Sequence, residues 1–151
     1  DAFEMQGQMT EAEQYRHRVR ELGQKTDHLT LGLFEATRSE NIDEALSLLG
    51  DEVQKRPNVY VLDAWSWALY RAGRLNEAQA ASDKACAHKT PEPRFYFHAG
   101  AIALARGNSE IGMKLINQAL AMNPAFDIVG AQEARRLIAQ HLENGGAHAS
   151  H

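Results

Sequence analysis

Three of the four prolines in this 151-residue chain are evenly spaced, and this spacing restricts the fold more than any other feature of the sequence. Pro57, Pro91 and Pro124 follow one another at intervals of about 34 residues, and Pro93 comes shortly after Pro91. Proline lacks a backbone amide and clashes with the preceding helical turn, so it ends a helix. Evenly spaced helix ends are typical of a stacked repeat. The chain length corresponds to about 4.4 units of this period.

Apolar residues recur with a helical period along nearly the whole chain, and no stretch alternates as a half-buried strand does. Gly73 and Gly107 are separated by the same interval as the prolines, each at the end of a predicted helix, where a left-handed residue is favoured. Glycine turns therefore alternate with proline turns, which predicts antiparallel helix pairs with a tight turn inside each pair. The predicted helices cover residues 10–22, 27–38, 42–56, 59–71, 75–88, 92–106, 109–122 and 127–143.

Superposing the segments supports a helical-hairpin repeat. The small residues Ala45, Ala78 and Gly112 take one equivalent position in successive units, where two helices must approach closely. Other pairs of residues at the same interval are alike or exchange a large side chain for a small one, as cores tolerate. These pairs are Leu62 with Tyr96, Trp65 with Ala99, Ser66 with Gly100, Leu69 with Ala103, and Ala85 with Ala119.

The period, the small-residue positions and the closing proline resemble the tetratricopeptide repeat. In the earliest full copy, Ser39 or Glu40 stands where glycine is usual. Residues 62–70 and 97–100 are also similar to the C-terminal repeats of larger bacterial proteins of this family, some of which are exported. The resemblance divides the chain into a partial repeat (1–25, the second helix of a truncated unit), a degenerate repeat (26–58), two further repeats (59–92 and 93–127), a capping helix (128–143) and a flexible tail (144–151).

The resemblance implies an all-α fold, a right-handed superhelical solenoid of antiparallel helix pairs with a C-terminal capping helix. In this family the first helix of each pair forms most of the inner groove. Leu62, Trp65, Ser66 and Leu69 match core positions of that helix, so other positions are expected to face the groove. The partner-binding candidates that the resemblance implies are Tyr60, Asp63, Trp67, Tyr70, Arg71, Arg94, Phe97 and His98, with Ala101 beside them and Thr30, Phe34 and Arg38 in the degenerate repeat.

This set predicts a protein-interaction scaffold that binds a peptide or a partner helix. Aromatic side chains mixed with arginines are the composition of binding hot spots, and Arg71 and Arg94 suit ligand carboxylates. Family members that bind chaperone C-terminal peptides use a lysine–asparagine clamp, whereas the matching positions here are Asp63, Trp67 and Arg71. An alternative for Trp67 and Tyr70 is packing against the neighbouring repeat or against N-terminal repeats missing from this sequence.

No motif for catalysis, for a metal or for a cofactor is found, so we expect a protein that is not an enzyme. The seven histidines are scattered, and none has the His-Glu-x-x-His spacing of a zinc site. Gly73 and Gly107 are isolated turn residues rather than parts of a phosphate-binding loop. The single cysteine, Cys86, takes an ordinarily apolar position, where an inert thiol is expected.

Charge and hydropathy restrict the partners. A net charge of -4 with interspersed signs argues against nucleic acid, and no apolar run approaches the roughly 18 residues of a membrane span. Two other functions stay open: a regulatory domain of a longer protein, and a self-assembly module in which the truncated first unit pairs through the apolar face at Val19 and Leu22. The compartment also stays open, cytoplasmic or exported.

Overall fold

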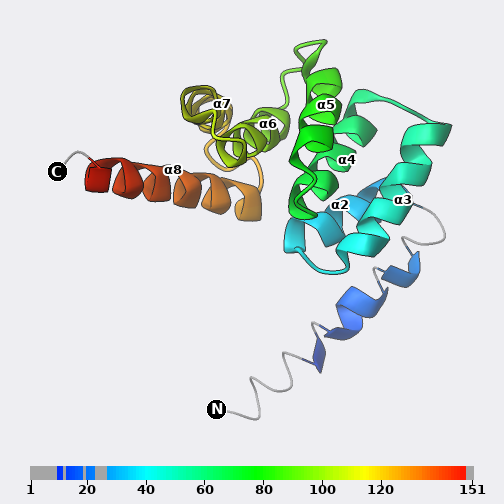
Figure 1. Cartoon of the computed structure of the whole chain (residues 1–151). Helices are drawn as coiled ribbons and strands as arrows, with labels where there is room; N and C mark the ends of the chain where they lie inside the picture. The colour runs from blue at the N-terminus through cyan, green and yellow to red at the C-terminus, as the bar shows by residue number, and fades with distance from the viewer. Residues whose placement is uncertain (1–9, 12, 19, 23–26, 149–151) are drawn as a thin grey trace.

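The computed structural model describes residues 10–11, 13–18, 20–22 and 27–148. Every element among these residues is a helix, which confirms the predicted all-α class (Figure 1). The described residues between 10 and 22 are helical as well, whereas Val19 of the predicted self-assembly face lies outside the described residues. The labelled helices are α2 (His28–Arg38), α3 (Ile42–Lys55), α4 (Val59–Arg71), α5 (Leu75–Cys86), α6 (Pro93–Ala105), α7 (Ser109–Met122) and α8 (Ile128–His148).

Helices that follow one another along the chain pack as pairs. α2 packs on α3, α4 on α5, and α6 on α7, and each pair contacts the next through α3 with α4 and α5 with α6. The first helices also pack on one another, α2 against α4 and α4 against α6, and α8 contacts α6 and α7 along part of its length (Figure 1). The pairs therefore form a row whose first helices are in direct contact.

The turns inside the pairs use left-handed backbone conformations. Gly73 and Gly107 have φ values of 75° and 85° in the second and third pairs, as the sequence predicts. The first pair has no glycine in its turn, and Ser39 and Asn41 adopt φ values of 55° and 46° there. Small polar residues tolerate this conformation better than bulky ones, so the pair closes without the usual glycine.

Small residues on the first helix of a pair let its partner helix approach. A Cβ atom at Gly32 would lie 2.5 Å from Cγ of Leu49, and one at Gly100 would lie 2.7 Å from Cγ1 of Ile116. Gly32, Ser66 and Gly100 recur at the interval of the proposed repeat. Gly32 therefore takes the same place in its pair as Gly100 does in the third.

The last helix is longer than predicted. α8 continues to His148, so the segment predicted as a flexible tail from residue 144 is helical as far as it is described. The segment contains no proline, and nothing in its sequence blocks further backbone hydrogen bonds. Within the part of the chain that the structure describes, every helix is too short or too polar to cross a lipid bilayer.

Candidate functional site

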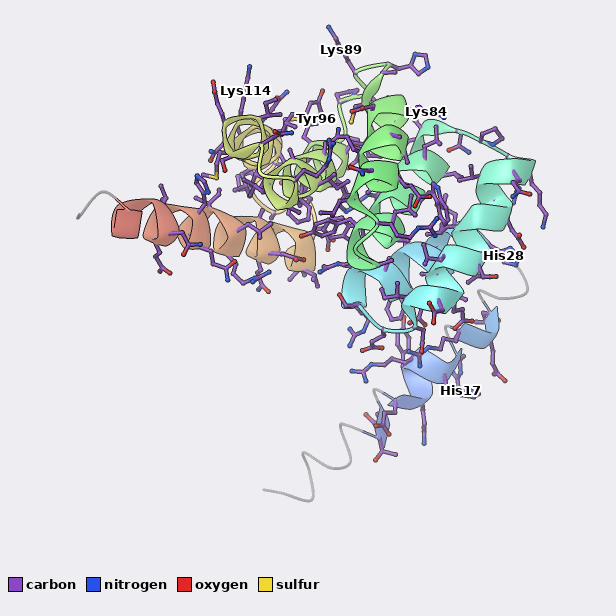
Figure 2. The ribbon with its side chains drawn as sticks, viewed as in Figure 1. His17, His28, Lys84, Lys89, Tyr96 and Lys114 are labelled. Carbon is purple, nitrogen blue, oxygen red and sulfur yellow. The ribbon has the colours of Figure 1, made fainter. Side chains whose placement is uncertain are left out.

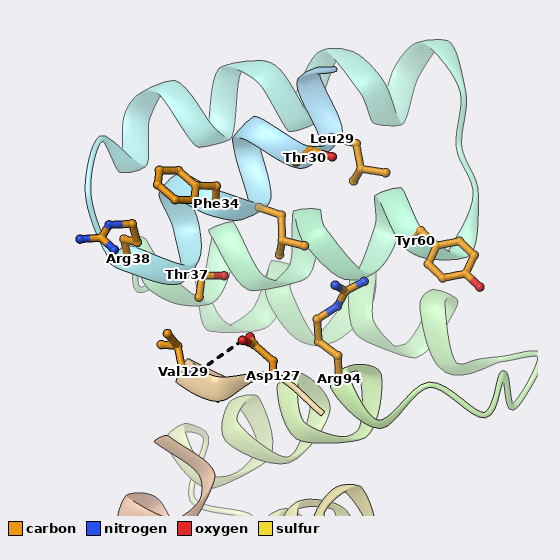
Figure 3. A pocket seen from close by; sticks show the side chains of 10 residues that line it. Leu29, Thr30, Phe34, Thr37, Arg38, Tyr60, Arg94, Asp127 and Val129 are labelled. Carbon is orange, nitrogen blue, oxygen red and sulfur yellow. Dashed lines mark hydrogen bonds between the residues drawn. The ribbon is translucent and has the colours of Figure 1, made fainter. Parts of the chain in front are cut away.

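A groove of about 530 Å³ opens where α2, α4, α6 and the start of α8 meet (Figure 3). It is larger than three other pockets of the described chain, whose volumes are about 370, 240 and 190 Å³. Most of its surface is apolar, and charged side chains enter from three elements. The lining residues are Leu29, Thr30, Leu33, Phe34, Thr37 and Arg38 of α2, Tyr60 of α4, Arg94 of α6, and Asp127 and Val129 at the start of α8.

One side of the groove is formed by α2, and the helical period decides which of its residues face the groove. Residues three and four apart share a helix face, so Thr30, Phe34 and Arg38 of α2 form one row along it. The start of this wall is fixed by a cap. Asp27 accepts hydrogen bonds from the backbone amide and the hydroxyl of Thr30, at 3.0 and 2.6 Å, and the hydroxyl bond is the main reason that the pKa of Asp27 is lowered.

Arg94 points into the groove from α6 (Figure 3) and is anchored beneath it. Its Nε atom lies 3.4 Å from Oδ2 of Asp63. Asp63 is only 1% exposed, and both of its carboxylate oxygens lie 3.0 Å from Nδ1 of His98. The Nδ1 atom of His98 donates to this carboxylate when it carries a ring proton. The buried carboxylate thus has the partners that burial of a charge requires, and it holds Arg94 in place.

Trp67 lies at the centre of an aromatic cluster between the first helices. It is 1% exposed, and its ring centroid lies 4.0 Å from that of His98, 4.8 Å from Tyr70 and 5.4 Å from Phe97. Phe97 continues the cluster to Phe126, at 5.7 Å. Burial and the negative charge of Glu133 raise the pKa of the Tyr70 hydroxyl. This cluster packs α4, α6 and the segment before α8 together.

Arg71 ties three helices together. Its Nη2 atom lies 2.7 Å from Oε2 of Glu133 in α8 and donates to the carbonyl of Thr37 in α2 at 3.4 Å. Its guanidinium carbon also lies 4.6 Å from the ring centroid of Trp67, within cation–π range. Arg71 therefore fixes α8 against α2 and α4, and so fixes one wall of the groove.

The eight predicted partner-binding residues fall into two groups. Tyr60 and Arg94 line the groove, as do Thr30, Phe34 and Arg38 of α2. The other six predicted residues are engaged inside the protein instead, because the first helices of neighbouring pairs pack directly on each other. Asp63, Trp67, Phe97 and His98 are buried, and Tyr70 and Arg71 are partly buried in contacts with Trp67 and Glu133. Ala101 is buried too.

Several lining residues were not predicted. Leu29 and Leu33 are partly buried against the hydrophobic core, and both also line the groove. Leu29 and Leu33 are four residues apart and directly precede Thr30 and Phe34, so their helical spacing could have predicted that they lie beside these residues in the groove. Asp127 and Val129 line the groove because α8 packs beside α6. A local sequence pattern does not predict this contact between helices.

The groove combines apolar surface with a small number of polar side chains. Its polar side chains are two arginines, two threonines, a tyrosine and a carboxylate that accepts from the Val129 amide at 3.3 Å. Among the described residues, no group of three or more histidine, cysteine, aspartate or glutamate side chains could hold a metal ion. Cys86 is partly buried, away from the groove lining, and burial raises the pKa of its thiol.

Comparisons with protein families, with curated proteins and with solved structures give no significant match.

Arg71 and Glu133 should show a clear energetic coupling. In a double-mutant cycle with Arg71→Ala and Glu133→Ala, followed by urea unfolding, we expect about 1–2 kcal/mol, because the pair is largely buried and its hydrogen bond is charge-assisted. The exposed Arg74–Glu77 pair, at 2.6 Å, is the matched control and should couple far more weakly. Equal coupling in the two cycles would show that Glu133 does not hold α8 in place.

Proposed function

We propose that this chain is a non-catalytic protein-interaction domain of the tetratricopeptide type, a right-handed solenoid whose groove binds an extended peptide or a partner helix. Three features support this proposal. Antiparallel pairs follow one another in a row, their first helices are in contact, and small residues recur at one interval in Gly32, Ser66 and Gly100. A ligand groove on the first helices is what this architecture provides.

The groove itself is the observation that carries the proposal. Its volume of about 530 Å³ lies within the range of ligand-binding clefts, roughly 300–1,000 Å³. Leu29, Leu33, Phe34 and Val129 offer apolar surface for side chains of a ligand. Clefts that are mostly apolar with a few placed polar groups are the usual form of a binding site.

The charges of the groove indicate the chemistry of the ligand. Arg38 and Arg94 bring two positive charges to the lining and Asp127 brings one negative charge, while the carboxylates that pair with the two arginines, Glu40 at 3.2 Å and Asp63 at 3.4 Å, lie outside the lining. The Arg94 side chain is 29% exposed although its Nε atom is buried and faces Asp63. Arginine binds carboxylates through paired hydrogen bonds. We therefore expect a ligand segment that combines an apolar side chain with at least one aspartate or glutamate.

Selection from a random dodecapeptide library displayed on phage, against the immobilised full chain, tests this function. The enriched peptides should combine apolar residues with acidic ones. Their affinity, measured by fluorescence polarisation, should fall about tenfold or more for Phe34→Ala and for Arg94→Met, because each change removes a central contact. Arg94→Met keeps the apolar stem of the side chain and removes its charge.

Lys114→Ala is the matched control for loss of a positive charge. Lys114 is an exposed residue of α7, and it does not line the groove (Figure 2). Binding should be unchanged in this variant. Peptides that bind the Phe34 and Arg94 variants as tightly as the unmodified chain would contradict the assignment of the groove.

A further inference from the structure

Glu35 is a buried anion that the groove does not use. Its exposure is 0%, although it belongs to α2, whose other side lines the groove. A buried carboxylate is costly unless charged or hydrogen-bonding partners surround it. Glu35 has such partners, and they come from outside the three helix pairs as well as from within them.

A guanidinium fills the space beside Glu35. Arg20, from the N-terminal segment 10–22, donates from Nε to Oε1 of Glu35 at 2.6 Å and from Nη2 to Oε2 at 3.4 Å. Its Nη2 atom also donates to Oε2 of Glu40 at 3.0 Å. Asn41 completes the arrangement by donating from Nδ2 to Oε2 of Glu35 at 3.1 Å. The carboxylates of Glu35 and Glu40 thus both bind the guanidinium of Arg20, and the Asn41 amide orients the buried carboxylate of Glu35.

The segment that carries Arg20 is otherwise largely exposed. Among its described residues, Arg16 and Arg20 are partly buried and the rest are exposed, with Tyr15 at 69% and Leu22 at 59%. Figure 2 shows the segment, marked by His17, projecting away from α2 and α3. Arg20 attaches this segment to the first helix pair through Glu35 and Glu40.

We propose that Glu35, Glu40 and Asn41 form an arginine-binding site on the first helix pair, and that the segment 10–22 is its detachable ligand, which a second copy of the chain can supply. A lysine does not replace the ligand, because an ammonium lacks the planar fork that donates to both oxygens of Glu35. In the unmodified chain the segment's own Arg20 fills the site and keeps a second copy out. This inference does not depend on the proposed function of the groove.

Complementation between two full-length variants tests this site. Arg20→Ala keeps an empty site and lacks the ligand, whereas Glu35→Gln keeps the ligand and has a damaged site. Each variant alone should sediment as a monomer. An equimolar mixture should form a heterodimer, with an association constant about tenfold or more above that of either variant with itself, as hydrogen bonds to charged groups allow. A mixture that stays monomeric at concentrations of about 1 mM, where millimolar affinities still register, would overturn the proposal.

A peptide experiment decides the same question with one variant. A fluorescent peptide of residues 10–22 should bind the Arg20→Ala chain more tightly than the same peptide with alanine or lysine at position 20, and should not bind the unmodified chain. Circular dichroism establishes that each variant is folded. If Glu35→Gln does not fold, Glu40→Gln replaces it, because the Glu40 side chain is 36% exposed and tolerates the change more readily. Equal binding of the three peptides would overturn the proposal.

Discussion

Trp67→Ala should lower the free energy of unfolding by about 3–5 kcal/mol, the range found when a large aromatic side chain is removed from a core. Trp67 is among the largest fully buried side chains of the described chain. Its removal leaves a cavity between α4 and α6 and takes away the ring contacts with His98, Tyr70 and Phe97. Urea unfolding followed by circular dichroism measures the change.

Tyr60→Ala is the matched control for Trp67→Ala. It removes an aromatic residue from the same helix, but Tyr60 is 46% exposed and lines the groove. Its loss should cost far less stability, and we expect it to affect ligand binding instead. A change below about 1 kcal/mol for Trp67→Ala, the size of an ordinary surface effect, would show that Trp67 is not packed in the core.

Gly100→Ala should lower the free energy of unfolding by about 1–3 kcal/mol, as overpacking of a core typically costs. A Cβ atom there would lie 2.9 Å from the carbonyl oxygen of Gly112 and 3.0 Å from the amide nitrogen of Ile116. These are backbone atoms, so α6 and α7 would have to move apart. The loss should exceed the gain of about 1 kcal/mol that alanine brings to a helix.

Gly145→Ala is the control for this second change. Gly145 also lies in a helix, α8, but a Cβ atom there would have no neighbour within 4 Å. Thermal or urea unfolding should therefore show equal or slightly higher stability for Gly145→Ala. If Gly100→Ala were as stable as this control, the close approach of α6 and α7 would be wrong.

The sequence predicted the helix pairs well because their boundaries depend on local chemistry. Proline does not continue a helix, and glycine favours a left-handed turn at a helix end. The effects of Pro57 and Gly73 on the backbone are therefore local and do not depend on the rest of the fold. The first pair was harder, because Ser39 and Asn41 replace the expected glycine and take its conformation. Whether a non-glycine residue does so depends on the helices that meet at the turn.

Of the eight partner-binding candidates, Tyr60 and Arg94 line the groove, and the internal contacts of the other six have one cause. A periodic pattern identifies which helix face a residue occupies, which suffices for Phe34 and Arg38. The periodic pattern does not predict how closely the first helix of the following pair packs against that face. Trp67 and His98 are on the expected side, but α4 and α6 meet there and bury both. Residue types gave one hint, since a buried aspartate such as Asp63 needs a partner, and His98 of the next first helix provides it.

The groove assignment is tested most directly by a methyl NMR titration of the full chain with a peptide chosen by the library selection. The methyl signals of Leu29, Leu33 and Val129 should shift together as the peptide saturates, because all three line the groove. The signals of Val53 and Leu62, which line a separate and smaller pocket, should not move. Shifts confined to Val53 and Leu62, with the groove methyls unchanged, would contradict the account.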